Sequence, residues 1–218
     1  MSATATGVRI ELADATLAGD LGLPDRARGL VVFVHGSGSS RHSSRNRFVA
    51  STLVDRGFAT LLFDLLTEAE DRDDETRFDI PLLTRRLLGV TTWLRKRDDV
   101  GALALGYFGA STGAAAALHA AATLQSEVRA VVSRGGRPDL ALDSLPRVTA
   151  PTLLIVGGAD EEVIHLNQQA YAALHCPKEL AVVAGATHLF EEPGALDQVA
   201  ELAGDWFGQH FSGVARPG

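Results

Sequence analysis

Short apolar runs alternate with amphipathic segments along most of this chain. Leu30 to Val34 is apolar throughout, which is typical of a strand covered on both faces. Pro81 to Arg97 instead carries apolar residues at helical spacing, which predicts an amphipathic helix. The same criteria predict strands at 58–63, 103–108, 130–133, 152–156 and 180–183, and helices at 44–56, 111–124, 164–174 and 194–211.

This alternation predicts an α/β fold: a mainly parallel central sheet with helices on both faces. Residues 8–13 and 16–23 are expected to form an N-terminal antiparallel hairpin. A chain of 218 residues without a linker or repeat fits one domain, with an ordered core at about 8–211 and a frayed tail at 212–218. The segment 68–79 is dense in acids and is interpreted as a solvated loop that could act as a lid. A short loop and helix are expected between the strands at 130–133 and 152–156.

Composition narrows the classes of function. Hydrophobic residues make up 46% and charged residues 22% of the chain, as in an ordinary globular protein, and the net charge of -7 disfavours a nucleic-acid partner. No apolar run reaches the roughly 20 residues of a membrane span, and residues 1–7 lack the features of a signal peptide. Cys176 is the single cysteine, so no intrachain disulfide is possible. We therefore expect a cytoplasmic protein.

Gly109-Ala110-Ser111-Thr112-Gly113 matches the pattern G-x-S-x-G. The pattern follows a predicted strand and opens an alanine-rich helix, which is the setting of a nucleophile elbow. Glycines permit the tight turn that lifts the serine clear of the sheet, and the helix N-terminus adds positive potential. The alternative is a tight turn with a helix-capping serine. The sequence favours Ser111 as a nucleophile.

A serine nucleophile needs a base, and His188 is the best-placed histidine. It follows the strand at 180–183, so it lies at the same edge of the sheet as Ser111. The remaining histidines are in or at the ends of predicted helices, in the loop after the strand at 30–34, or directly after that strand: His35, His42, His119, His165, His175 and His210. An ordinary surface histidine is the alternative interpretation of His188.

The base in turn needs a carboxylate to orient it. Asp160 is the first acid after the strand at 152–156 and its Gly157-Gly158-Ala159 turn. Glu161 and Glu162 are neighbouring candidates, and a helix-capping aspartate is the alternative. Ser111, Asp160 and His188 stand in the chain order of α/β-hydrolases.

A tetrahedral intermediate also needs N–H donors for its oxyanion. We predict the backbone amide of Thr112, directly after the nucleophile, and that of Ser37 in the loop His35-Gly36-Ser37-Gly38. His35 is expected to support this loop rather than act as a second base. A phosphate-binding role for 36–40 is disfavoured, because no Walker lysine and no G-x-G-x-x-G are present.

Together these motifs resemble the α/β-hydrolase superfamily, and within it the small, capless dienelactone hydrolase-like proteins. The resemblance covers about residues 8–211 and rests on 34–38, 109–113, 156–160 and 186–188. It implies hydrolysis of an ester or lactone. One departure is that dienelactone hydrolases proper use a cysteine nucleophile, whereas this chain has Ser111. The short spacing between the strands at 130–133 and 152–156 leaves no room for a large cap.

Arginines near the same edge are candidates for substrate binding. Arg134 follows a strand beside Ser111, and Arg41 lies after the predicted oxyanion loop. Either could hold a carboxylate or phosphate, and the alternative is a solvated or internally paired arginine. Asp64, at the end of its strand, is expected to support the oxyanion loop.

The sequence thus predicts a serine hydrolase that cleaves a small carboxylic ester, thioester or lactone through an acyl-enzyme. It predicts no cofactor and no metal site, because its histidines and cysteine lack ligand spacing. A homodimer is possible on this interpretation. Acyl transfer on the same triad, or a catalytically silent binding protein on the hydrolase fold, are the rival hypotheses.

Overall fold

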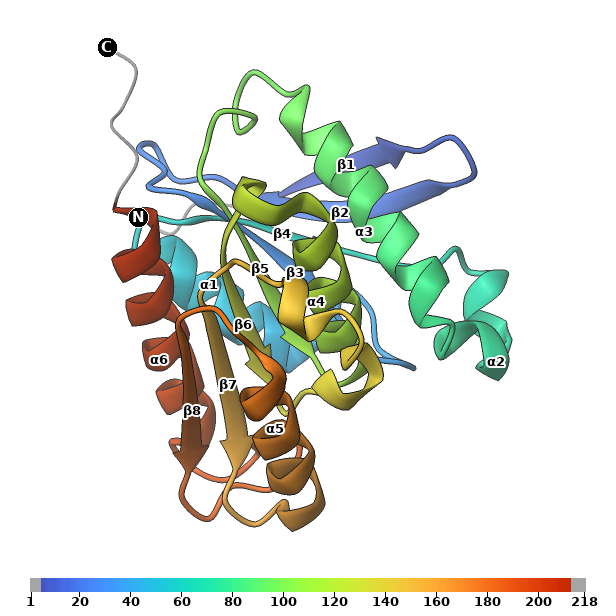
Figure 1. Cartoon of the computed structure of the whole chain (residues 1–218). Coiled ribbons are helices and arrows are strands. Elements are labelled where there is room, and N and C mark those ends of the chain that lie inside the picture. The colour runs from blue at the N-terminus through green and yellow to red at the C-terminus, as the bar shows by residue number, and fades with distance from the viewer. Residues whose placement is uncertain (1–4, 213–218) are drawn as a thin grey trace.

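The structure, a computed structural model, describes residues 5–212. Eight strands form one sheet in the order β1-β2-β4-β3-β5-β6-β7-β8 (Figure 1). The strands are β1 (Thr6–Glu11), β2 (Thr16–Gly22), β3 (Leu30–Val34), β4 (Ala59–Phe63), β5 (Leu105–Ala110), β6 (Val128–Arg134), β7 (Thr152–Gly157) and β8 (Lys178–Val183). The helices are α1 (Ser44–Asp55), α2 (Asp74–Arg77), α3 (Ile80–Arg95), α4 (Thr112–Leu124), α5 (Glu161–Ala173) and α6 (Ala195–Phe211). Short 3₁₀ helices are η1 (Glu70–Arg72), η2 (Gln125–Glu127), η3 (Pro138–Ala141) and η4 (Leu145–Arg147).

The pairing confirms the predicted mainly parallel sheet with an N-terminal hairpin. β1 and β2 are antiparallel, and β2 joins β4 in antiparallel register. Every pairing from β4 across to β8 is parallel. The parallel strands β3, β4, β5 and β7 are buried along their whole length, as their continuous apolar runs require.

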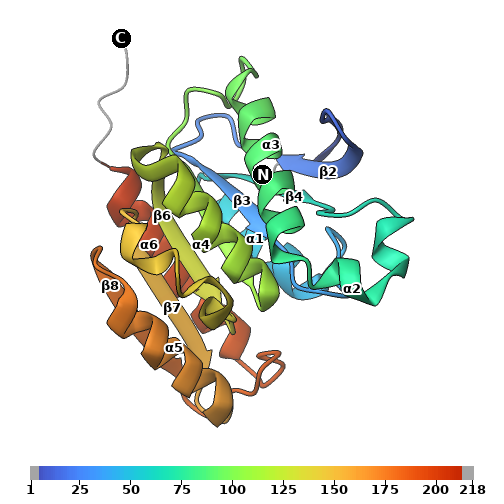
Figure 2. The same cartoon turned by 45° about the vertical axis from the view of Figure 1, so that its right-hand side comes forward.

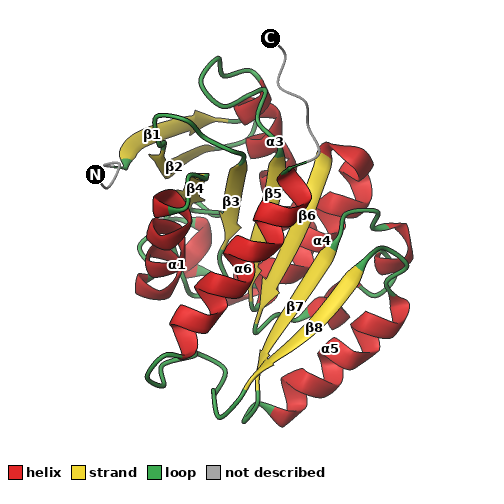
Figure 3. Cartoon of the chain, turned by 90° about the vertical axis from the view of Figure 1, so that its left-hand side faces the viewer, coloured by secondary structure: helices red, strands yellow, loops and turns green. Residues whose placement is uncertain are grey.

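Helices cover both faces of the sheet. Helices α1 and α6 pack on one face, around Leu53, Val199 and Phe207. Helices α3, α4 and α5 pack on the other, where α4 contributes a row of buried alanines. Figure 2 shows α3, α4 and α5 together, and Figure 3 shows α1 and α6 in front of the strands. Alanines let α4 approach the sheet closely because they add so little bulk.

The chain changes direction across the sheet at β3, which lies between β4 and β5. Such a switch point leaves a crevice at the carboxyl ends of the strands. Val34 stands opposite Gly109, so the residues that follow β3 and β5 meet at this edge. The arrowheads of β7 and β8 mark the same edge at the bottom of Figure 1.

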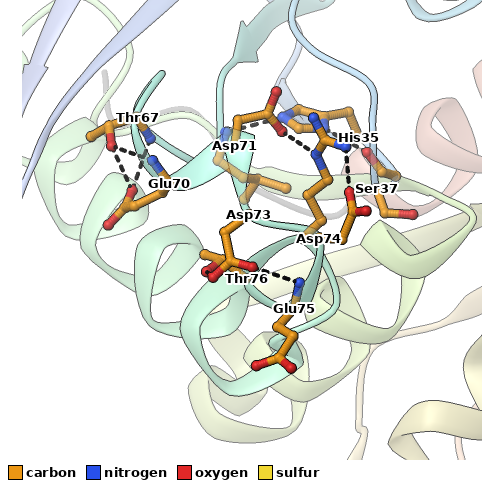
Figure 4. A network of polar contacts seen from close by, with 12 residues as sticks. His35, Ser37, Thr67, Glu70, Asp71, Asp73, Asp74, Glu75 and Thr76 are labelled. Atoms are coloured by element: carbon orange, nitrogen blue, oxygen red, sulfur yellow. Dashed lines mark hydrogen bonds and ion pairs between the residues drawn. The ribbon is translucent and has the colours of Figure 1, made fainter.

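The acidic segment 68–79 differs from its interpretation as a solvated loop. It folds into η1 and α2 and is anchored by arginines. Glu70 binds the buried Arg86 at 2.5 Å and accepts hydrogen bonds from Thr67, while Asp71 binds Arg77. Figure 4 shows part of this network, with Asp71 next to His35 and Ser37. The pairing of Glu70 with Arg86 could not be predicted from the composition of the segment, because Arg86 belongs to the next helix, α3.

The connection between β6 and β7 also differs from the predicted short loop and helix. It contains η3 and η4, each with a proline at its first or second position. Proline lacks the N–H that an α-helical ladder needs, and at the start of a short helix, where Pro138 and Pro146 lie, that N–H would have no partner anyway. The connection is too short for a cap, as the sequence predicted.

Of the predicted tail at 212–218, all but Ser212 lies outside the described residues. Among residues 5–212, no helix combines the length and apolar character needed to cross a bilayer.

We predict that Glu70→Gln destabilises the fold by about 1.5–3 kcal/mol, the usual size of a hydrogen bond to a charged group. The reason is that the Arg86 guanidinium, which is buried, loses the charge of its closest carboxylate. Urea unfolding measures the change. Asp99→Asn, which breaks the more exposed Arg97–Asp99 pair, is the control and should leave the midpoint unchanged within error. Equal effects of the two variants would contradict the anchoring role of Glu70.

Candidate active site

Ser111 occupies a sharp turn between β5 and α4. Its φ of 51° and ψ of -125° lie outside the regions that non-glycine residues normally adopt. Such strain persists only where the surrounding structure enforces it, and it is common at functional sites. The turn leaves Ser111 partly exposed at the carboxyl edge of the sheet. The alternative of a capping serine does not apply, because the side chain makes no capping hydrogen bond to α4.

The turn needs a glycine at position 113, two residues after the serine. A Cβ at Gly113 would lie 2.2 Å from the Val34 carbonyl oxygen and 2.4 Å from that of His35. The first turn of α4 therefore packs directly against the end of β3. This contact fixes Ser111 relative to the loop that follows β3.

His188 and Asp160 are joined by a hydrogen bond. His188 Nδ1 lies 2.7 Å from Asp160 Oδ2. Asp160 precedes α5 but makes no side-chain capping bond to it, so its carboxylate is not occupied by the helix. Glu161 and Glu162, the alternatives from the sequence, lie in the first turn of α5 and are exposed. The structure thus pairs the two residues that were predicted as base and orienting acid.

The sheet brings His188 to the neighbourhood of Ser111. Arg134 at the end of β6 pairs with Ala110 in register, and the Ser111 N–H donates to the Arg134 carbonyl at 3.4 Å. Gly135 follows with a φ of +51°, and a Cβ there would lie 3.6 Å from His188 Cε1. A Cβ at Gly135 would thus approach the imidazole, while the preceding residue, Arg134, is hydrogen-bonded to the elbow.

The two predicted oxyanion donors lie together. The Ser37 N–H donates to the Thr112 hydroxyl at 2.9 Å, and Thr112 is the residue after Ser111. A Cβ at Gly36 would lie 2.9 Å from Ser111 Cβ, which places this loop against the serine. The Ser37 amide is therefore engaged by an internal acceptor, a contact that could not be predicted from the sequence.

His35 is buried beneath this loop, and both of its ring nitrogens hydrogen-bond to backbone groups. Its Nε2 accepts a hydrogen bond from the Leu65 N–H at 3.0 Å, so its proton must be on Nδ1, which donates to the Gly36 carbonyl at 2.9 Å. Burial lowers the pKa of His35, and the opposing effects of Gly36, Asp64 and Asp71 are smaller. These contacts match the expected supporting role, because the neutral ring links the loops after β3 and β4.

The two candidate arginines differ in their surroundings. Arg41 forms ion pairs with Asp64 and Asp20, and its backbone N–H also donates to Asp64. It lines a cavity of about 470 Å³ that includes His35 and Asp71 but neither Ser111 nor His188. Arg134 is buried and donates to Asn46 in α1 at 3.2 Å. Sequence reasoning did not single out Asn46 or Phe190, which both contact Arg134.

Cys176 is excluded as a nucleophile by its position. It precedes β8 at the amino end of the parallel strands, the edge opposite Ser111, and it is buried next to Thr152. Burial raises the pKa of its thiol, which disfavours the reactive thiolate. Within residues 5–212, no group of three or more His, Cys, Asp or Glu side chains is arranged to hold a metal ion.

Comparison with known proteins places the chain in a family. The model of the dienelactone hydrolase family matches residues 15–211. The chain belongs to the dienelactone hydrolase family. A crystal structure of a dienelactone hydrolase from Anabaena variabilis ATCC 29413 is 52% identical, superimposes with a TM-score of 0.93, and is matched over 96% of this chain and 99% of that one. The chain therefore has the α/β-hydrolase fold of a hydrolase family.

A more distant structure shares the fold alone. Est1E from Butyrivibrio proteoclasticus is 17% identical with a TM-score of 0.79, over 94% of this chain and 99% of that one. It supports the architecture and carries no argument about substrate.

Curated relatives from Mycobacterium tuberculosis are longer. A protein of strain ATCC 25618 / H37Rv, named "Putative phosphoribosyl transferase", is 59% identical over 211 residues, which is 97% of this chain but 48% of that protein. A protein of strain CDC 1551 / Oshkosh has the same name and the same match. The chain thus spans about half the length of these relatives.

We predict that His35 makes stability depend on pH. The pKa of His35 is lower in the folded than in the unfolded state, so above pH 6.5 its imidazole is neutral in both states and no stability is lost. Below pH 6.5 the unfolded chain binds the proton first. The free energy of unfolding then falls by up to about 1.4 kcal/mol per pH unit until the pH reaches the pKa of the folded state. Urea unfolding at about pH 7.5 and about pH 5.5 measures this difference.

His35→Gln should reduce the loss of stability on acidification, whereas His42→Gln should not. His42 is an exposed histidine of the same loop and serves as the matched control. An identical pH dependence in wild type and His35→Gln would refute the prediction.

Proposed function

We propose that this chain is a serine-dependent hydrolase of small carboxylic esters, thioesters or lactones. The observation that carries the proposal is the Asp160–His188 hydrogen bond at the edge where the strained elbow presents Ser111. Membership of the dienelactone hydrolase family supports a hydrolase. The proposal goes beyond the family in naming serine as the nucleophile. Cys176, the single cysteine, supports this choice because it is buried at the opposite edge of the sheet.

In this mechanism Ser111 Oγ attacks the acyl carbon and His188 takes the hydroxyl proton. Asp160 engages Nδ1 of His188, so Nε2 is the nitrogen left to exchange protons with Ser111. The negative charge of Asp160 stabilises the imidazolium that forms. His188 then protonates the leaving alcohol, thiol or ring oxygen. Water, deprotonated by the same imidazole, attacks the acyl-enzyme and releases the acid.

The backbone N–H groups of Thr112 and Ser37 are the proposed oxyanion donors. The Ser37 N–H is bonded to the Thr112 hydroxyl, so the tetrahedral oxyanion has to replace that hydroxyl as acceptor. An oxyanion accepts a stronger hydrogen bond than a neutral hydroxyl, which favours the exchange. Gly36 packs against Ser111 and keeps the loop close to the developing charge.

The connection between β6 and β7 bears on the size of the substrate. It contains the short η3 and η4 helices, so within residues 5–212 no cap is inserted there. This arrangement suits small, accessible acyl groups. Residues 68–79 approach Ser37 closely enough to share a small hollow with it, which is compatible with the expected lid role.

The name of the mycobacterial relatives refers to a different reaction. Since the matched part makes up 48% of the protein from strain H37Rv, we infer that phosphoribosyl transfer belongs to the remaining half of that protein. On this proposal the present chain corresponds to a hydrolase half that accompanies a transferase half.

We predict that Ser111→Ala abolishes ester hydrolysis and labelling by a fluorophosphonate probe. The expected loss in kcat is at least about 10⁴-fold, since the nucleophile itself is removed. Hydrolysis of 4-nitrophenyl esters and gel fluorescence measure the two readouts. Ser39→Ala, which removes a serine from the neighbouring loop, should leave both intact. Undiminished labelling of Ser111→Ala would show that the nucleophile is elsewhere.

We predict that Asp160→Asn lowers kcat by about 10³–10⁴-fold, because an amide can neither fix the required tautomer nor stabilise the imidazolium. Glu161→Gln is the matched control, since it removes the charge of the adjacent carboxylate, and its kcat should stay within about twofold. Steady-state kinetics on one ester measure both variants. If the two variants lose activity equally, Asp160 does not have the orienting role.

A further inference from the structure

Asn167 is a polar side chain on the buried face of α5. The buried residues of this helix are Val163, Asn167 and Ala170, at helical spacing, and Asn167 is 0% exposed. Its amide nitrogen donates to the Val163 carbonyl at 2.8 Å and to the Gly136 carbonyl at 3.0 Å. The bond to Val163 stays within the helix. The bond to Gly136 joins α5 to the loop that follows β6.

The partners of the Asn167 amide fix its orientation. Nδ2 faces two carbonyl oxygens, which can only accept, so the amide cannot be turned over without losing both bonds. The amide oxygen Oδ1 is buried and has no hydrogen-bond donor. An unpaired buried acceptor costs stability, so packing alone does not account for an amide at this position. The directed bond to Gly136 is what this side chain supplies.

The loop that Asn167 binds is hydrogen-bonded to Ser111 on both sides of Gly136. The Arg134 carbonyl accepts the Ser111 N–H at 3.4 Å, and the Arg137 N–H donates to the Ser111 carbonyl at 3.0 Å. Gly136 is buried, and among residues 5–212 its carbonyl has no hydrogen bond other than the one from Asn167. Asn167 therefore fixes the centre of the segment that holds the backbone of Ser111.

The same loop lies against His188, and α5 follows Asp160. A Cβ at Gly135 would lie 3.2 Å from the His188 carbonyl oxygen and 3.6 Å from its Cε1. Asp160 directly precedes α5, and its carbonyl accepts the N–H of Ile164 at 2.9 Å, so its position follows that of the helix. Asn167 lies about two helical turns further along. One side-chain hydrogen bond thus connects the helix of the acid with the loop that contacts the serine and the histidine.

We propose that Asn167 is a positioning residue for the reaction of Ser111, and that its bond to Gly136 sets the distance between α5, which begins after Asp160, and the elbow. Asn167 touches no reacting group and acts through Gly136 and the backbone of α5. A displacement on the order of 1 Å at a catalytic group lowers the rate by about 100-fold, so a single bond of this kind is sufficient to matter. The proposal rests on the proposed function, in which Asp160 orients His188.

Asn167→Thr removes the bond to Gly136 selectively. Threonine is similar in size to asparagine, and four threonines in helices of this chain donate to the carbonyl four residues earlier: Thr84, Thr91, Thr92 and Thr123. A threonine at position 167 therefore keeps a bond to Val163 but does not reach Gly136. With a 4-nitrophenyl ester, kcat should fall by about 10–100-fold while KM stays within about twofold.

Thr91→Val is the matched control for lost stability. Thr91 is a buried side chain of α3 that donates to the Leu87 carbonyl and shares a hydrogen bond with the Tyr107 hydroxyl. This variant should lower the urea midpoint at least as much as Asn167→Thr but keep kcat within about twofold. An equal loss of kcat in the two variants would mean that stability, not position, limits activity, and would overturn the proposal. So would a kcat of Asn167→Thr within twofold of an active wild type.

Two NMR measurements test the position of the loop and of Asp160 without any substrate. In Asn167→Thr the Arg137 N–H should exchange with solvent about 5–10-fold faster, and the Nδ1 proton that His188 shares with Asp160 should shift or broaden. Thr91→Val should leave the His188 signal unchanged. A wild type that hydrolyses no ester counts against the proposed function, and these two signals then still decide the role of Asn167. If both are unchanged in Asn167→Thr, the positioning role is wrong.

Discussion

The close packing of α4 against the end of β3 determines the geometry of this edge of the molecule. The backbone of Gly113 touches the carbonyl groups of Val34 and His35, and no side chain fits between them. Ser111 is therefore held at a positive φ, with Gly36 against its Cβ. Both β3 and β5 are buried central strands, so the contact is built on the covered centre of the sheet. The positions of the residues that follow these strands depend on it.

Support for the site comes from beneath rather than from a cap above. His35 joins the loops after β3 and β4 through two backbone groups, and Arg134 contacts both α1 and Phe190. Polar groups in these positions have few alternative partners, because water is largely excluded. The loops can therefore be short and still hold a defined arrangement. This explains how the edge of the sheet holds a defined arrangement without a cap between β6 and β7.

The fold was predictable because it depends on local patterns: apolar runs for the strands, helical spacing for α3, and a glycine-rich turn at Ser111. The order of Ser111, Asp160 and His188 was likewise readable from the positions of strand ends. Side-chain partnerships were not, since Ser37 and Thr112 are 75 positions apart, and Arg134 and Asn46 are 88. The same limit explains the acidic segment, whose structure depends on Arg86 in the next helix. The composition of a segment indicates whether it prefers solvent. It does not indicate which distant side chain pairs with it in the folded chain.

The bond between the Ser37 amide and the Thr112 hydroxyl has a consequence for selectivity between states of the reaction. In the proposed mechanism this hydroxyl is a built-in competitor for the anion hole. A neutral substrate carbonyl is no better an acceptor than the hydroxyl, so it gains little by displacing it. A tetrahedral oxyanion is a much better acceptor and gains the whole difference. In this mechanism the Ser37 amide therefore stabilises the transition state more than the bound substrate. Hydrogen bonding accelerates a reaction only under that condition.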